Sequence, residues 1–127
     1  MNKKIIETSE APQPIGPYSQ AVSAGGFLFL SGQIPINPQT GELISTEVKT
    51  QTRQVLKNLE SVLSAAETTL QSVVKTTIFL KSMDDFPAVN EIYNEFFGES
   101  LPARSTVEVG RLPKNVLIEI DCIALSS

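Results

Sequence analysis

An arginine and two acidic residues in the last quarter of the chain are the side chains best suited to chemistry. Arg104 opens a strand-like segment, while Glu119 and Asp121 interrupt the apolar segment 116–125. A guanidinium can hold a carboxylate through two parallel hydrogen bonds, and a partly dehydrated carboxylate can orient water or move a proton. The pattern is typical of a site for a small acid, but a structural ion pair or unrelated surface charges would use the same residue types.

Other positions could border such a site. Tyr18 follows a Gly-Pro pair in a loop and could present its phenol to a ligand, or pack its ring against the core edge. Ser31 and Gly32 end a strand, where a glycine lets a ligand approach the backbone or simply begins a turn. Asn90 interrupts an apolar helical stripe, as solvated residues also do.

The composition excludes several classes of protein. The chain has no histidine and a single cysteine, Cys122, which excludes histidine-based triads, histidine metal sites and intrachain disulfides. Cys122 alternates with isoleucines, so we expect a small buried core residue.

Ten Lys and Arg against fourteen Asp and Glu leave a net charge of −4, which argues against binding along a nucleic-acid backbone. No apolar run is long enough for a signal peptide or a membrane span, so we expect a cytoplasmic protein.

The elements that must position these residues follow from hydrophobic periodicity. Apolar residues spaced by three, four and seven predict amphipathic helices over 46–66, capped by Ser45 or Thr46, and over 86–97, ended by Gly98. Alternating or β-branched segments predict strands at 20–24, 27–31, 73–80, 104–109 and 116–125. This order indicates one α+β domain over residues 1–127, with a single mixed β-sheet and two helices packed on one face.

Alternation along the predicted strands also bears on assembly. Side chains at 104, 106 and 108 share one face of their strand, whereas segments 27–30 and 117–125 are apolar on both faces. Two helices cover only one face of such a sheet, so the second face needs another cover, most economically another copy of the chain. A partly exposed sheet with scattered apolar side chains is the alternative.

Five short motifs follow one another along the chain. They are IGPYSQ at 15–20, SGQIP at 31–35, PARS at 102–105, VEVGRLPK at 107–114 and IEI at 118–120. In this order and spacing they resemble the RidA/YjgF/YER057c/UK114 family over essentially the whole sequence. The resemblance implies a chorismate-mutase-like α+β fold assembled as a homotrimer, with sites in clefts between subunits.

The resemblance also implies an activity. Members of the family are enamine/imine deaminases that use no cofactor and no metal. They hydrolyse reactive 2-imino acids such as 2-iminobutanoate and 2-iminopropanoate to 2-keto acids and ammonia. Dehydratases that depend on pyridoxal phosphate release these imines, so a functional link to such enzymes is expected. Free 2-imino acids already hydrolyse in water, so a fixed carboxylate clamp and one oriented water could suffice for catalysis, and the absence of histidine does not count against it.

Several residues match the family's motifs. By resemblance, Arg104 is the carboxylate-binding arginine and Glu119 the acid that positions the hydrolytic water. Tyr18 borders the ligand, Ser31 and Gly32 form the pocket edge, and Asn90 lies near the arginine. Thr106 stands where many members have cysteine. If this position offers only its backbone N–H to the ligand, the change is harmless.

Two other functions remain open. A trimer with small-acid clefts could bind 2-keto acids as a sensor or regulator without turnover. Some family members are described as endoribonucleases or translation inhibitors. Scattered basic residues and the absence of histidine argue against RNA cleavage here.

Overall fold

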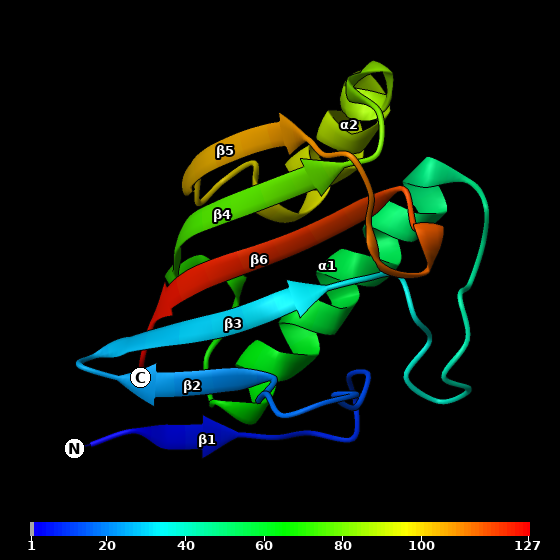
Figure 1. Ribbon diagram of the computed structural model, residues 1–127. Coiled ribbons are helices and arrows are strands. Elements are labelled where there is room, and N and C mark those ends of the chain that lie inside the picture. Colours follow the sequence, from blue (N-terminus) through cyan, green and yellow to red (C-terminus); the bar gives the residue numbers. More distant parts are fainter. Residues whose placement is uncertain (1) are drawn as a thin grey trace.

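One six-stranded sheet covered on one face by two helices makes up the protein, in a computed structural model that describes residues 2–127 (Figure 1). The strands are β1 (Lys4–Ile6), β2 (Ala21–Ala24), β3 (Phe27–Gln33), β4 (Val73–Leu80), β5 (Ala103–Glu108) and β6 (Ile118–Leu125). Helix α1 (Val48–Ala65) connects β3 to β4, and helix α2 (Phe86–Phe97) connects β4 to β5. The strand order is β1-β2-β3-β6-β4-β5, with β4 and β5 parallel and the other pairs antiparallel. The predicted α+β architecture is confirmed.

Strand β6 divides the sheet into its two faces. It lies between β3 and β4, and its burial alternates residue by residue. The side chains under the helices are fully buried: Ile118, Ile120, Cys122 and Ala124. The side chains that alternate with them, Glu119, Asp121 and Ile123, point away from the helices and are half-buried. The prediction of a buried core cysteine is confirmed, and burial raises the pKa of the Cys122 thiol to about 12.

The face away from the helices keeps large apolar side chains partly exposed. Phe27, Phe29 and Leu125 are 40%, 45% and 48% exposed. Phe29 lies opposite Ile123, and Phe27 lies opposite Leu125, so β3 and β6 carry these residues as neighbours. The apolar second face that the sequence predicted is therefore present.

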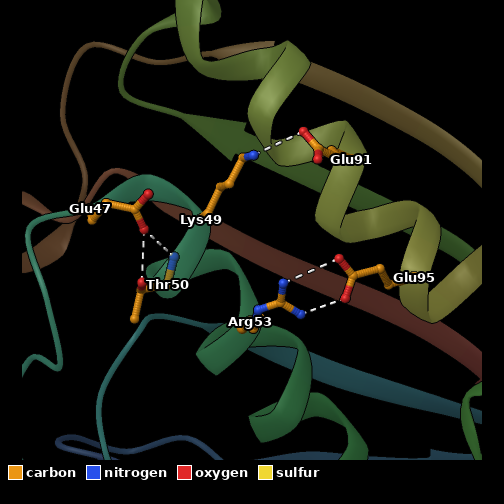
Figure 2. Close-up of polar contacts among 6 residues, drawn as sticks. All are labelled: Glu47, Lys49, Thr50, Arg53, Glu91 and Glu95. Carbon is orange, nitrogen blue, oxygen red and sulfur yellow. Dashed lines mark hydrogen bonds and ion pairs between the residues drawn. The ribbon is translucent and has the colours of Figure 1, made fainter.

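Helix α1 begins later than the sequence predicted. Its N-cap is Glu47, whose Oε1 accepts hydrogen bonds from the backbone N–H and the hydroxyl of Thr50, both at 2.8 Å (Figure 2). Ser45 accepts from the N–H of Glu47 at 2.9 Å and so turns the chain just before the helix. The prediction of Ser45 or Thr46 as N-cap is wrong, because the hydroxyl of Ser45 is used in that turn.

Two ion pairs join the exposed faces of α1 and α2 (Figure 2). Lys49 pairs with Glu91 at 2.9 Å, and Arg53 donates from both terminal nitrogens to Glu95. Exposed ion pairs contribute little to stability. All four side chains remain partly exposed on the outer surface of the two helices.

Of the described residues 2–127, no helix has both the length and the apolar composition needed to cross a membrane.

Candidate active site

Arg104 lies on the edge strand β5 and is held by α2. Its Nη1 donates to Oδ1 of Asn90 at 2.7 Å, and its Cζ lies 5.1 Å and 4.8 Å from the ring centroids of Phe86 and Tyr93. The faces of aromatic rings attract a guanidinium without neutralising it. The hydroxyl of Tyr93 is in turn hydrogen-bonded to that of Thr76 at 2.8 Å, which fixes the ring.

The charge of Arg104 has no counter-ion within the described part of the chain. The ion pairs there are Lys49–Glu91 and Arg53–Glu95. A guanidinium has five N–H donors in a planar fork, and one bond to Asn90 leaves the others available. A structural ion pair, the alternative that the sequence left open for Arg104, is absent from residues 2–127. The arrangement suits an external carboxylate.

A cavity of about 610 Å³ opens beside Arg104. Its lining comes from α2 and from the loop that leads into β5, and it includes Asn90, Tyr93, Leu101 and Arg104. Leu101 is 74% exposed, so this cavity offers an apolar surface next to the guanidinium.

Thr106 and Glu108 lie on the same side of β5 as Arg104, as the alternation predicted. Thr106 is aligned with buried Ile78 and is half-buried. Glu108 accepts from the backbone N–H of Met83 at 2.8 Å, so its carboxylate caps the short turn before α2. This bond gives Glu108 a structural task and argues against a pair of catalytic carboxylates that includes it.

Glu119 lies on β6, where its carboxylate covers the backbone of Gly32 on β3. A β-carbon at position 32 would collide with Oε2 of Glu119, so this position of the carboxylate requires glycine at residue 32. The register between β3 and β6 shifts between Leu30 and Gln33, and this irregularity brings Gly32 under the acid. Burial raises the pKa of Glu119, and the charge of Asp121 raises it further.

Ser31 and Tyr18 lie near the same end of β3. Ser31 Oγ donates to the backbone carbonyl of Ser19 at 2.6 Å, which ties the loop after Tyr18 to the strand. Tyr18 is 55% exposed. Together with Gly32 and Ile15 it lines a cavity of about 560 Å³. The structure thus brings Tyr18 and Gly32 to one cavity, and Glu119 packs against that glycine.

Arg104 and Glu119 face opposite sides of the sheet. Arg104 is aligned with buried Thr76 and contacts α2, whereas Glu119 is aligned with Phe79 and alternates with residues buried under the helices. The predicted residues therefore form two groups within one chain. Arg104, Asn90 and Thr106 lie on the helix side of β5. Tyr18, Ser31, Gly32 and Glu119 lie around β3 and β6.

Two structural supports of the site were missed by the sequence analysis. The buried side chain of Gln20 bonds the backbone of Thr8, Ala11 and Pro12 and so holds the loop that carries Tyr18. Phe86 and Tyr93 belong to the apolar stripe of the predicted helix 86–97, but the sequence analysis did not predict their contact with Arg104. Their spacing around Asn90, four residues before and three after, places all three on one helix face and was a usable signal.

Comparison with known proteins identifies the family. The family model described as Endoribonuclease L-PSP matches residues 8–126. A RutC family protein of Pyrococcus horikoshii is 59% identical, over 96% of this chain and 97% of its own length. A protein of Dermatophagoides farinae named 2-iminobutanoate/2-iminopropanoate deaminase is 46% identical, over 97% of this chain and 96% of its own. The chain belongs to the RidA/YjgF family.

A solved structure agrees with this membership. The crystal structure of E. coli TdcF with bound serine is 46% identical in sequence, with a TM-score of 0.92 over 98% of this chain and 99% of that chain. Residues 2–127 contain no group of three His, Cys, Asp or Glu side chains that could hold a metal ion.

Proposed function

We propose that this member of the RidA/YjgF family is an imine deaminase that hydrolyses 2-imino acids, 2-iminobutanoate and 2-iminopropanoate among them, to 2-keto acids and ammonia. The observation that carries the proposal is Arg104: a guanidinium held by an amide and two aromatic rings, with its other donors available. A substrate carboxylate fits these donors bidentately. Names of relatives support the activity, since one is called a deaminase of these two imines.

Glu119 supplies the proton transfer in this proposal. Water adds to the carbon of the protonated imine, the iminium form of the substrate, while the Glu119 carboxylate accepts a proton from that water and the π electron pair of the C=N bond passes to nitrogen. The resulting tetrahedral intermediate carries a hydroxyl and an amine on one carbon. The proton passes from Glu119 to the amine, the C–N bond breaks, and the departing ammonia takes up the hydroxyl proton as the keto group forms. The products are a 2-keto acid and ammonia, which leaves as ammonium. A carboxyl group with a raised pKa suits this work, because it can hold the proton between the two steps.

The proposed site combines groups from two copies of the chain. Arg104 and Glu119 face opposite sides of one sheet, so one substrate cannot contact both within a single copy. A second copy that packs on the apolar open face of the sheet could bring its own Glu119, with Tyr18, Ser31 and Gly32, against Arg104, Asn90 and Thr106 of the first copy. We propose a homotrimer with such sites between subunits, as the family resemblance implies.

The experiment is ammonia release from 2-iminobutanoate that a pyridoxal-phosphate-dependent dehydratase generates in the same cuvette. We expect the wild-type protein to accelerate hydrolysis and Arg104→Ala to lose this acceleration. Arg53→Ala is the matched control, because it removes the same charge from an exposed ion pair on α1. Equal activity of Arg104→Ala and the wild-type protein would contradict the proposal.

Two other functions give different results. A sensor would bind 2-keto acids in an Arg104-dependent way but would not accelerate imine hydrolysis. An endoribonuclease, the activity in the description of the matching family model, would cleave RNA. Cleavage that persists in Arg104→Ala would support that activity over the deaminase.

A further inference from the structure

We propose that Asp121 is a positioning residue for the reaction proposed above. Its fixed negative charge, two residues from Glu119 on the same face of β6, makes Glu119 the carboxyl group that gains and releases the proton. The inference rests on the proposed function, because it assigns to Asp121 a task that acts through Glu119.

The two carboxyl groups are neighbours on the open face of the sheet. Both alternate with side chains buried under the helices, and both are half-buried. Residues two apart on a strand are about 7 Å apart on the same face. Two negative charges at this distance in a partly dehydrated place repel each other, so ionisation of one opposes ionisation of the other.

The surroundings decide in favour of a charged Asp121. Thr77 lies directly across from it on β4, and the Thr77 hydroxyl and the Lys75 ammonium both favour the ionised form of Asp121. The Lys75 Nζ donates to Ser105 Oγ on β5 at 2.8 Å, which holds the ammonium on this face. Burial is the largest effect and raises the pKa of Asp121 on balance, and these contacts limit that rise.

The surroundings of Glu119 contain no such support. β3 brings the backbone of Gly32 against it, and β4 brings Phe79 directly across, and neither residue carries a charge. On β6 its charged neighbour is Asp121. Within one copy of the chain, burial first and Asp121 second therefore raise the pKa of Glu119. In the proposed shared site, the Arg104 guanidinium of the other copy is paired with the substrate carboxylate. Two acids whose environments differ in this way divide the roles of fixed anion and proton carrier.

For the reaction, the charge of Asp121 makes the Glu119 carboxylate a stronger base. A Glu119 carboxylate beside a fixed anion takes a proton from water more readily and keeps it until the amine can accept it. Asp121 touches neither substrate nor water in this scheme, so its effect appears in the pH dependence of turnover rather than in substrate binding.

The test is the pH profile of kcat in wild type, Asp121→Asn, Asp121→Glu and Glu60→Gln. The acid limb of this profile, the range in which kcat falls as the pH is lowered, reports protonation of Glu119. In Asp121→Asn the repelling charge is gone, the pKa of Glu119 falls, and the limb moves to lower pH by about one unit. Asp121→Glu keeps the charge and restores the limb to higher pH. Glu60→Gln removes an equal charge from the exposed face of α1 and leaves the limb unmoved.

A second measurement needs no substrate. Titration of the Glu119 side-chain carboxyl carbon by ¹³C NMR shows the same downward shift in Asp121→Asn, and Asp121→Ser replaces that variant if the asparagine chain does not fold. The proposal is overturned if, in a folded variant, neither the acid limb of the kcat profile nor the ¹³C titration of Glu119 shifts from its wild-type position. Glu119→Gln separates this failure from that of the proposed function: if it retains full turnover, Glu119 is not the proton carrier, whatever Asp121 does.

Discussion

The side chains that hold Arg104 are uncharged, and their geometry explains why an arginine is needed at this position. Asn90 accepts one hydrogen bond, and the rings of Phe86 and Tyr93 stack near a flat, delocalised cation. A lysine ammonium is compact and cannot present two parallel donors while it lies over a ring. The side chain is therefore oriented in advance but its charge remains uncompensated.

Arg104→Lys is expected to lower kcat/KM for 2-iminobutanoate by about 30-fold or more, since the charge is kept but the two-pronged geometry is lost. The change should appear mainly in KM, because the guanidinium holds the carboxylate before and during the reaction. Steady-state kinetics on folded protein check this. Unchanged kinetics would show that the substrate carboxylate binds elsewhere.

Glu119→Gln is expected to lower turnover by on the order of 10²-fold or more while 2-keto-acid binding persists, because glutamine hydrogen-bonds but cannot accept a proton. Thermal unfolding of the same sample separates this role from a structural one, which would lower Tm and leave the activity of the folded protein intact.

The same variant carries an expectation for stability. Burial raises the pKa of Glu119 in the folded state, so the folded state binds the proton more tightly than the unfolded state. The stability that this group contributes is fully present below its ordinary pKa of 4.5 and is lost as pH rises through the higher folded value. Glu119→Gln should therefore flatten the decline of Tm with pH above 4.5 and should be at least as stable as wild type at pH 7.

At the level of elements, one helix face and one strand irregularity build the two groups. Phe86, Asn90 and Tyr93 lie on the same face of α2, because residues three, four and seven apart share a face. The register shift of β3 brings Gly32 beneath the Glu119 carboxylate. Each feature acts on a side chain from another element: the face of α2 on Arg104 of β5, and the irregularity of β3 on Glu119 of β6.

Gly32→Ala is expected to displace the Glu119 carboxylate, because the added β-carbon would collide with it. We expect turnover to fall about tenfold or more and Tm to fall as well, as overpacking at a tight contact does. Gly110→Ala is the matched control, since a β-carbon there meets nothing within 4 Å. Equal turnover in the two variants would mean that the position of Glu119 tolerates the change.

At the level of the whole molecule, the separation of the two groups makes assembly part of the chemistry. The apolar open face carries Phe27, Phe29 and Leu125, which a second copy could bury. Light scattering on a sizing column should give about three times the chain mass of 13.8 kDa, as closed threefold symmetry requires. A stable monomer that retains activity would contradict a site between subunits.

Mixing two inactive variants tests the same point more directly. If each site takes Arg104 from one subunit and Glu119 from the next, trimers reassembled from equal amounts of Arg104→Ala and Glu119→Gln chains contain some intact sites. Random assembly makes about a quarter of the sites intact, because each site samples two chains independently. Regained activity of that size supports the shared site, and none is regained if both groups serve a site within one subunit.

Local periodicity and short motifs were sufficient to predict the elements and the family. Helices and strands follow from local periodicity, so α2 and the alternation of Arg104, Thr106 and Glu108 were predictable. The motifs around Tyr18, Gly32 and Arg104 were sufficient to predict membership of the RidA/YjgF family. The N-cap of α1 was mispredicted, because several polar residues compete locally and only the path of the loop selects Glu47 over Ser45.

Which residues contact one another depends on long-range packing and was visible only in the folded chain. The contact of Arg104 with Asn90 depends on how α2 crosses β5, and the contact of Glu119 with Gly32 depends on the register of β3 against β6. A one-residue change of register would turn a side chain to the other face of the sheet. The opposite orientation of Arg104 and Glu119 is therefore a property of strand pairing. Pairing between distant segments is set by packing of the whole core, which no local pattern contains.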